Sequence, residues 1–276
     1  MSGAVWWRTW RTLPATATAP PPGFTTANFD WQGQYPPQGS YATVTDPRSG
    51  QPYTVFEGHY TYNGIPFVPS WGGSMFEGLM PNLVVPETTW GPQSFGLNDK
   101  NYARVQMSWA TQGLGYPVWG LSPSSTPDDT GNYDAYGAVG PAYPNAISSN
   151  ANCCAYDQQA VSPHASFLAL DVLPQEAYAN IVALRKTYPD LYGPYGFFDA
   201  VAPKDYSYTT TVNGQSVQQL VHAGQVGHRY LVLDQAMIMA AIDNAFFDHA
   251  MQRHFAADPV GAAARPYLAA EQFSIQ

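Results

Sequence analysis

Apolar residues recur at helical spacing along most of this chain. Between a Gly-Gly-Ser run and Pro86, apolar side chains fall at i, i+1, i+4, i+5 and i+8: Met75, Phe76, Leu79, Met80 and Leu83. This stripe predicts a helix over residues 72–85. The same periodicity, bounded by Gly, Pro or Asp, predicts further helices over residues 99–114, 164–173, 175–187, 234–247, 249–255 and 261–273.

Alternating segments joined by turn residues predict β-hairpins between these helices. Hairpins are expected over residues 41–56, 59–68 and 208–221, and the last two turn at Asn-Gly pairs. Asn-Gly between alternating segments is the strongest short hairpin signal. Residues 116–152 are rich in Gly, Pro, Ser and Tyr and predict a long packed loop. The pattern therefore predicts a mostly α protein with β-hairpins.

The start of the chain differs from the rest in composition. Residues 1–40 are rich in Trp, Thr and Pro, which predicts an extended arm ahead of one folded domain over residues 41–276. The first residues lack the apolar core and cleavage site of a secretory signal, so we expect none. No apolar run is long enough for a membrane span.

Charge is scarce in this protein. Only 11% of its 276 residues are charged, the net charge is −9, and 14% are aromatic. An acidic chain of this kind is a poor partner for nucleic acid. Aromatic rings with few charges instead favour a neutral, hydroxyl-rich ligand, because sugar faces stack on rings and sugar edges form hydrogen bonds.

Glu77 is the first candidate for chemistry. It is the one ionisable residue in the helix expected over residues 72–85, and it lies on the flank of the apolar stripe. One interpretation is a solvated glutamate at the edge of a buried helix. The other is a carboxyl group beside a pocket, tuned for acid–base work.

A second carboxyl group would be needed for glycoside hydrolysis, which uses one to protonate the leaving oxygen and another to activate water or attack. Asp234 is the candidate, because it opens the apolar helix over residues 234–247. The alternative is that Asp234 is a helix N-cap. Asp199 follows an aromatic turn and is expected to bind sugar hydroxyls, orient a water or satisfy turn N–H groups.

Several further residues are candidate ligand contacts, each with a structural alternative. The rings could stack on sugar or belong to the core, and the helix-start histidine could bind a sugar hydroxyl or a backbone group. The set is Trp71, Ser74, Trp119, His164, Tyr195, Phe197 and Gln235. The loop with Asp128, Asp129, Asn132 and Asp134 lacks the spacing of a calcium-binding EF-hand loop, and no cofactor motif is present, so no metal or cofactor is expected.

Five segments together resemble the glucoamylase-like domain of bacterial endo-β-1,2-glucanases and cyclic β-1,2-glucan synthases. The first reads PSWGGSMFEGLMPNLVVPE, and all five follow the family order at residues 69–87, 115–124, 161–171, 191–200 and 230–238. The resemblance implies an α/α toroid of the (α/α)6 type, inverting hydrolysis of β-1,2-glucan with Glu77 as the acid, and a periplasmic or secreted location.

The sequence departs from this family in the number of its helices. It offers about half of the helices that a complete toroid needs, so we expect the C-terminal part of one, with hairpins at one rim and the N-terminal half missing. The helix over residues 234–247 is apolar nearly all round and would need neighbours on every side. The alternative function is a carbohydrate-binding or structural module without catalysis.

Overall fold

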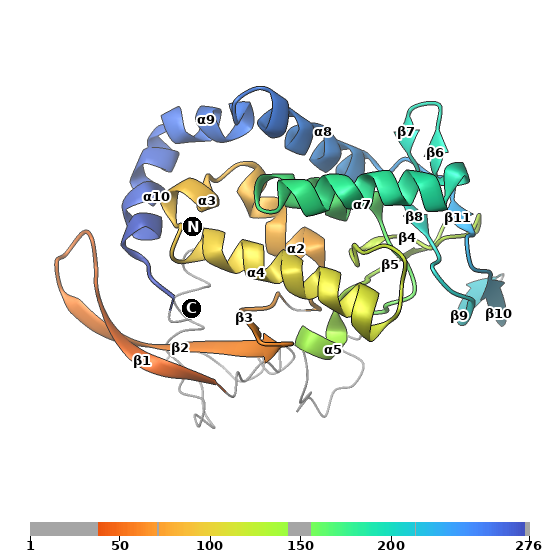
Figure 1. The fold of residues 1–276 in the computed structure, drawn as a ribbon, viewed down its shortest axis with the longest axis horizontal. Helices are drawn as coiled ribbons and strands as arrows, with labels where there is room; N and C mark the ends of the chain where they lie inside the picture. The colour runs from red at the N-terminus through yellow and green to blue at the C-terminus, as the bar shows by residue number, and fades with distance from the viewer. Residues whose placement is uncertain (1–37, 71, 143–155, 213, 274–276) are drawn as a thin grey trace.

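The computed structural model describes residues 38–70, 72–142, 156–212 and 214–273 (Figure 1). Residues 1–37 of the expected arm and Trp71 lie outside the described residues. Strand β1 (Gln38–Thr45) begins inside the last part of the expected arm.

Helices make up somewhat under half of the described chain, and most of the expected ones are present with shifted ends. They are α2 (Met75–Leu79), α3 (Glu87–Trp90), α4 (Phe95–Ser108), α5 (Val139–Ala142), α6 (Pro163–Leu168), α7 (Pro174–Thr187), α8 (Val232–Phe246), α9 (Ala250–Ala257) and α10 (Pro259–Ala270). In Figure 1, α8, α9 and α10 follow one another along one edge, while α4 and α7 cross the middle.

Two expectations about these helices need correction. The single helix expected over residues 72–85 is wrong, because α2 gives way to a 3-10 turn at Met80–Leu83. Pro81 lies in the first turn of that segment and has no N–H to donate to the preceding helical turn. Helix α8 begins at Val232, so Asp234 lies inside the first turn and is not the N-cap.

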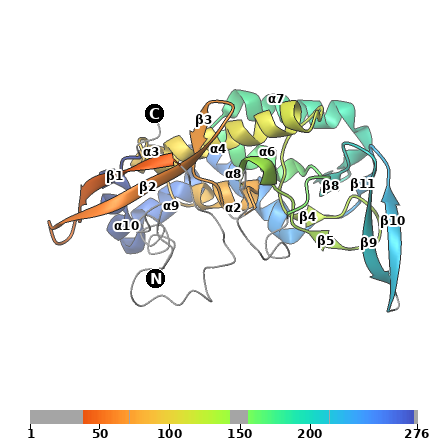
Figure 2. The same ribbon diagram turned by 90° about the horizontal axis from the view of Figure 1, so that it is seen from below.

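The strands form small antiparallel sheets, and the expected hairpins are confirmed. Strand β2 (Pro52–Tyr62) pairs with β1 and with β3 (Ile65–Phe67), and β9 (Tyr206–Val212) pairs with β10 (Gln215–Val221). These two sheets lie at opposite ends of the molecule in both views (Figures 1 and 2). The short pairs between them are β4 (Ser124–Ser125) with β5 (Tyr133–Asp134), β6 (Tyr192–Gly193) with β7 (Gly196–Phe197), and β8 (Ala200–Val201) with β11 (Val226–Gly227).

Helix α6 lies at the centre of the core and packs against α2, α7 and α8. The core joins side chains from all of these helices, among them Met75, Leu79, Leu168, Leu184 and Met237. No helix in the described part of the chain is both long and apolar enough to cross a membrane.

One face of α8 remains open to solvent in spite of its apolar side chains. Val232, Met239 and Phe246 are 86%, 65% and 76% exposed. They are spaced by seven residues, which places them on one side of the helix. The other side of α8, with Met237 and Ala241, is buried.

Side-chain amides on the helices hold the irregular segments in place. The Gln106 amide donates to the Leu121 carbonyl oxygen (3.0 Å) and to that of Gly73, and it accepts the Leu121 N–H (3.1 Å). Asn180 makes the same two-way contact with the backbone of Trp119, at 3.2 and 2.8 Å. A buried backbone polar group needs such a partner.

Asp171 ties three helical segments together. Its Oδ2 accepts hydrogen bonds from Asn82 (2.8 Å), Thr88 (3.1 Å) and Gln252 (3.3 Å), and its Oδ1 lies 3.2 Å from His249 Nδ1. These partners belong to the 3-10 turn after α2, to α3 and to the start of α9.

We expect Asp171→Ala to destabilise the fold strongly, because it leaves several donors without an acceptor. Each buried group left unpaired costs about 1–3 kcal/mol. Asp171→Asn keeps an acceptor oxygen and should cost less, while Asp190→Ala, an exposed position, should cost almost nothing. Urea unfolding of the three variants measures the order. Equal losses for the Ala and Asn variants would contradict it.

Candidate active site

Glu77 lies in the first turn of α2, where the chain fixes both its backbone and its carboxyl group. Ser74 is the N-cap, and its Oγ accepts the Glu77 N–H at 3.2 Å. The Tyr156 hydroxyl donates to Glu77 Oε1. Glu77 Oε2 is buried and has no hydrogen-bond partner among the described residues. One carboxyl oxygen is thus engaged, and the other is available to carry a proton.

Glycines make the approach of Tyr156 possible. A Cβ on Gly72 would lie 1.9 Å from Cδ2 of the Tyr156 ring, and a Cβ on Gly137 would lie 2.1 Å from the Gly72 carbonyl oxygen. A side chain at Gly72 would displace the Tyr156 ring, and one at Gly137 would displace the backbone of Gly72. The ring therefore packs directly on backbone, which brings its hydroxyl to Glu77.

Asp199 and Asp234 form a buried carboxyl pair. Asp199 precedes β8, and its Oδ2 accepts hydrogen bonds from the Ser125 N–H (2.6 Å) and hydroxyl (2.9 Å). Asp199 Oδ1 and Asp234 Oδ2 are both buried and have no donor among the described residues. Two carboxyl groups in contact satisfy such oxygens by sharing a proton.

The carboxyl pair keeps its shared proton at neutral pH. Burial, together with the hydrogen bond and charge of Asp199, raises the pKa of Asp234 to about 9. The ordinary pKa of an aspartate is 3.8. The pair therefore carries one proton and one negative charge.

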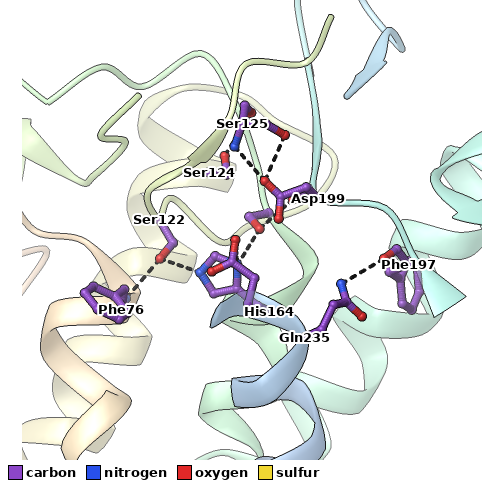
Figure 3. A network of polar contacts seen from close by, with 10 residues as sticks. Phe76, Ser122, Ser124, Ser125, His164, Phe197, Asp199 and Gln235 are labelled. Atoms are coloured by element: carbon purple, nitrogen blue, oxygen red, sulfur yellow. Dashed lines mark hydrogen bonds and ion pairs between the residues drawn. The ribbon is translucent and has the colours of Figure 1, made fainter. Parts of the chain in front are cut away.

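His164 lies beside the pair at the start of α6. The ring is 1% exposed. Its Nδ1 lies 2.6 Å from Ser162 Oγ, and its Nε2 lies 2.7 Å from Ser122 Oγ (Figure 3). Burial lowers the pKa of His164 to about 3, so the ring is neutral. Asp234 Oδ2 lies 3.6 Å from Nδ1, which is too long for a hydrogen bond.

Tyr133, on β5, lies near Glu77 and the carboxyl pair and is 57% exposed. Burial, and then the charges of Asp234, Asp199 and Glu77, raise the pKa of its hydroxyl to about 12. All three carboxyl groups therefore lie within electrostatic reach of one phenol ring. The two catalytic residues expected from sequence, Glu77 and Asp234, come from distant parts of the chain to the same region.

The acid cluster could be considered as a metal site. Candidate ligand atoms of His164, Asp199 and Asp234 lie within 4.8 Å of one another. Both His164 nitrogens are already hydrogen-bonded to serine hydroxyls, so neither has a lone pair free for a metal. A shared proton explains the carboxyl pair without an ion.

The loop considered above as a calcium site is closed by hydroxyl groups. Asp128 Oδ1 accepts from Thr126 Oγ1 (2.9 Å) and Thr130 Oγ1 (2.6 Å), and Oδ2 accepts from Tyr208 (2.6 Å). These hydrogen bonds lower the pKa of Asp128 against the effect of burial. Asp128 therefore serves to hold the loop against β9.

Most of the expected ligand contacts have structural partners instead. Trp119 is 4% exposed and packs in the core, and Phe197 is buried with its ring edge-on to Phe167 and Tyr192. Neither ring presents a free face for stacking. The amide of Gln235 donates to the Phe197 carbonyl oxygen at 3.2 Å.

Tyr195 is the one described ring of the expected set that faces solvent. It is 83% exposed between β6 and β7, and it contacts Tyr230 edge-on at 5.8 Å. Its role in ligand binding stays a prediction. Ser74 is fully buried as the α2 cap, so it supports Glu77 and does not face a ligand.

Sequence reasoning missed Tyr156, Ser122, Ser125 and Tyr133. None of them carries a charge, and Tyr156 lies 79 residues from Glu77. Ser122 and Ser125 lie in a Ser-Pro-Ser-Ser run after Trp119-Gly120-Leu121. The one sequence signal that could have identified Ser122 and Ser125 was this cluster of hydroxyl side chains after Gly120.

Fold and site together define a helical domain with a cluster of buried carboxyl groups. The Glycoamylase family model, described as "Putative glucoamylase", matches residues 41–259. The chain therefore belongs to this family, which confirms the resemblance found in its sequence segments. It is 32% identical over 224 residues to the cyclic β-(1,2)-glucan synthase NdvB of Rhizobium meliloti (strain 1021). That match covers 76% of this chain and 7% of the synthase.

Solved structures share the fold at lower identity. An endo-β-1,2-glucanase from Chitinophaga pinensis, in complex with sophorotriose and glucose, matches with a TM-score of 0.53 at 17% identity. A β-1,2-glucanase from Parabacteroides distasonis matches with a TM-score of 0.55 at 16% identity. Each match covers 77% of this chain, but only 46% and 27% of the respective glucanase chains. The chain thus spans less than half the length of these relatives.

The shared proton predicts how stability depends on pH. The folded protein holds a proton on Asp234 that the unfolded chain releases near pH 4, so this residue's contribution falls as the pH rises from about 4 to about 9. Asp234→Asn cannot ionise. Relative to wild type, we therefore expect the free energy of unfolding of this variant to increase across that pH range, as measured by urea titration. Asp243→Asn, on the same helix, is the control, and parallel curves for wild type and Asp234→Asn would contradict the shared proton.

Proposed function

We propose that this chain provides the catalytic region of a glycoside hydrolase that acts on β-1,2-glucan. The observation that carries the proposal is the buried pair Asp199–Asp234, which hydrogen bonds through Ser162, His164 and Ser122 connect to the helix that bears Glu77. The family match and the glucan-related names of the relatives support the same substrate class. No cofactor is required by this chemistry.

Glu77 is the proposed general acid. Tyr156 engages Oε1, so the transferable proton sits on Oε2, the oxygen without a partner. As the glycosidic C–O bond breaks, this proton passes to the leaving oxygen. The carboxylate that results is stabilised by the Tyr156 hydroxyl and by its position in the first turn of α2.

The carboxyl pair is the proposed base. Because Asp234 holds a proton at neutral pH, the negative charge of the pair resides mainly on Asp199, whose Oδ2 is stabilised by Ser125. A water that attacks the anomeric carbon loses its proton to the pair. This direct attack inverts the configuration at that carbon. Asp234, the second catalytic residue expected from sequence, thus acts as half of a unit with Asp199.

The exposed Tyr195 is the proposed sugar-stacking residue among the described ones. Stacking and neutral hydrogen bonds depend little on ionic strength. Trp71, which lies outside the described residues, keeps its expected role as a second stacking ring within this proposal.

Glu77→Gln tests the acid directly. Glutamine keeps an oxygen for the Tyr156 hydroxyl but has no proton to donate, so we expect turnover of linear β-1,2-glucan to fall by about 10²- to 10⁴-fold. The thermal unfolding temperature should stay unchanged. The assay uses the full reading frame that contains this chain, and Glu176→Gln, exposed on α7, is the matched control.

Full turnover by Glu77→Gln would remove Glu77 from the mechanism. Glucan binding without turnover by the unmodified protein would favour the alternative of a carbohydrate-binding module. The products, followed by polarimetry or NMR from the first turnovers, distinguish an inverted from a retained anomer.

A complete α/α toroid is proposed as the setting of this site. The apolar stripe of Val232, Met239 and Phe246 on α8 is supporting evidence, because soluble proteins rarely leave such faces uncovered. The solved relatives contain more chain than this one, in which further helices would lie against that stripe. An N-terminal half of the same enzyme is the proposed cover.

The isolated chain should therefore self-associate through the α8 stripe. We expect Met239→Lys with Phe246→Lys to reduce the associated fraction in light scattering without lowering the unfolding temperature. Tyr178→Lys, at an exposed position on α7, should leave self-association unchanged. A wild-type chain that is monomeric, stable and fully active by itself would contradict the missing cover.

A further inference from the structure

A continuous line of hydrogen bonds joins the helix of Glu77 to the backbone of Asp199 (Figure 3). The Phe76 N–H donates to Ser122 Oγ at 3.0 Å, and Ser122 Oγ lies 2.7 Å from His164 Nε2. On the other side of the ring, Nδ1 lies 2.6 Å from Ser162 Oγ, which donates to the Asp199 carbonyl oxygen at 2.6 Å.

The ends of this line decide where every proton lies. A carbonyl oxygen only accepts, so the Ser162 proton points to Asp199, and Ser162 Oγ must accept the proton of Nδ1. In a neutral ring Nε2 then carries no proton, so it accepts the proton of Ser122 Oγ, which itself accepts from the Phe76 N–H. His164 is thereby the neutral tautomer with its proton on Nδ1.

We propose that His164 is a positioning residue that sets the acid on α2 against the carboxyl pair, through Ser122 on one side and Ser162 on the other. The inference rests on the proposed function of these carboxyl groups. It replaces the expected contact of His164 with a sugar hydroxyl, because the buried ring has no nitrogen left for a ligand.

The geometry explains why a neutral imidazole suits this place. A ring protonated on both nitrogens would turn Nε2 into a donor, and Ser122 Oγ would then face two donors and lose the acceptor for its own proton. A positive charge 3.6 Å from Asp234 Oδ2 would also draw the shared proton from the pair. Burial keeps the ring neutral and leaves that proton in place.

Breaking the two sides separately should affect different halves of the reaction. Ser122→Ala removes the hydrogen bonds between α2 and His164, so we expect kcat to fall by roughly 10- to 100-fold with KM little changed. The alkaline limb of the pH–rate profile, which is set by the pKa of the acid, should also move. Ser162→Ala removes the hydrogen bonds between His164 and the Asp199 carbonyl oxygen, so it should move the acidic limb of the pH–rate profile, which is set by the pKa of the base. Both variants are measured in the full reading frame on linear β-1,2-glucan.

His164→Asn tests the contact with Ser122 from the side of the ring. Its amide N–H can reach Ser162 in place of Nδ1, but nothing replaces Nε2, so it should reproduce the kinetics of Ser122→Ala. Adding Ser122→Ala to His164→Asn should then cost no more. Ser124→Ala, in the same segment but outside the line, should leave the profile unchanged, since its hydroxyl donates only to the neighbouring Ser125 carbonyl oxygen.

Three results would overturn the inference. Ser122→Ala and Ser162→Ala with unaltered kcat and pH profile, while Glu77→Gln is inactive, would refute the positioning role and leave the proposed function intact. An active Glu77→Gln would refute the proposed function itself. If the serine variants fail to fold, ¹⁵N NMR of the His164 imidazole in the unmodified protein tests the inference. We expect a neutral ring with its proton on Nδ1 from pH 5 to 8. The Nε2–H tautomer or a charged ring would refute the proposed hydrogen-bond line.

Discussion

Buried backbone without regular secondary structure is the constraint on which this structure depends. The segments around Gly73, Trp119 and Leu121 run beneath helices, where water cannot satisfy their N–H and C=O groups. Amide side chains of Gln106 and Asn180 meet these groups in both directions. An amide suits this task because it offers a donor and an acceptor without a charge that must be desolvated.

The same constraint shapes the surroundings of the three carboxyl groups. Glu77, Asp199 and Asp234 each lie at the end of a helix or beside a short strand. Neutral groups contact two of them: Ser74 accepts the Glu77 N–H, Tyr156 donates to the Glu77 carboxyl group, and Ser125 donates to Asp199. Cations are scarce in the chain, and among the described residues no arginine or lysine forms an ion pair with these acids. The pKa of Asp234 is set instead by burial and by Asp199, which is how Asp234 comes to hold a proton that an aspartate in water would release.

The sequence predicted the elements well because they follow local rules. The hairpin between β2 and β3 turns at Asn63-Gly64, and apolar periodicity located the longer helices. The short helices α3 and α5 were not expected, α4 begins at Phe95 instead of Asp99, and Pro81 interrupts the helix expected over residues 72–85. Glu77 and Asp234 were selected as scarce acids beside apolar stripes. Their companions could not be found in this way, since Tyr156 and Ser122 meet Glu77 and His164 only through long-range packing. Trp119, for which the sequence left stacking on sugar or core packing open, lies in the core with its backbone hydrogen-bonded to Asn180.

The contact between Gly72, Gly137 and the Tyr156 ring has a consequence for how this site tolerates sequence change. Two residues without functional groups determine where the hydroxyl beside Glu77 can lie, since even a methyl group on either would collide with ring or backbone. In a mutational scan scored by activity, these glycines would be as intolerant as the acids. Natural selection would then retain them for the space they leave empty, a role that an inventory of reactive side chains overlooks.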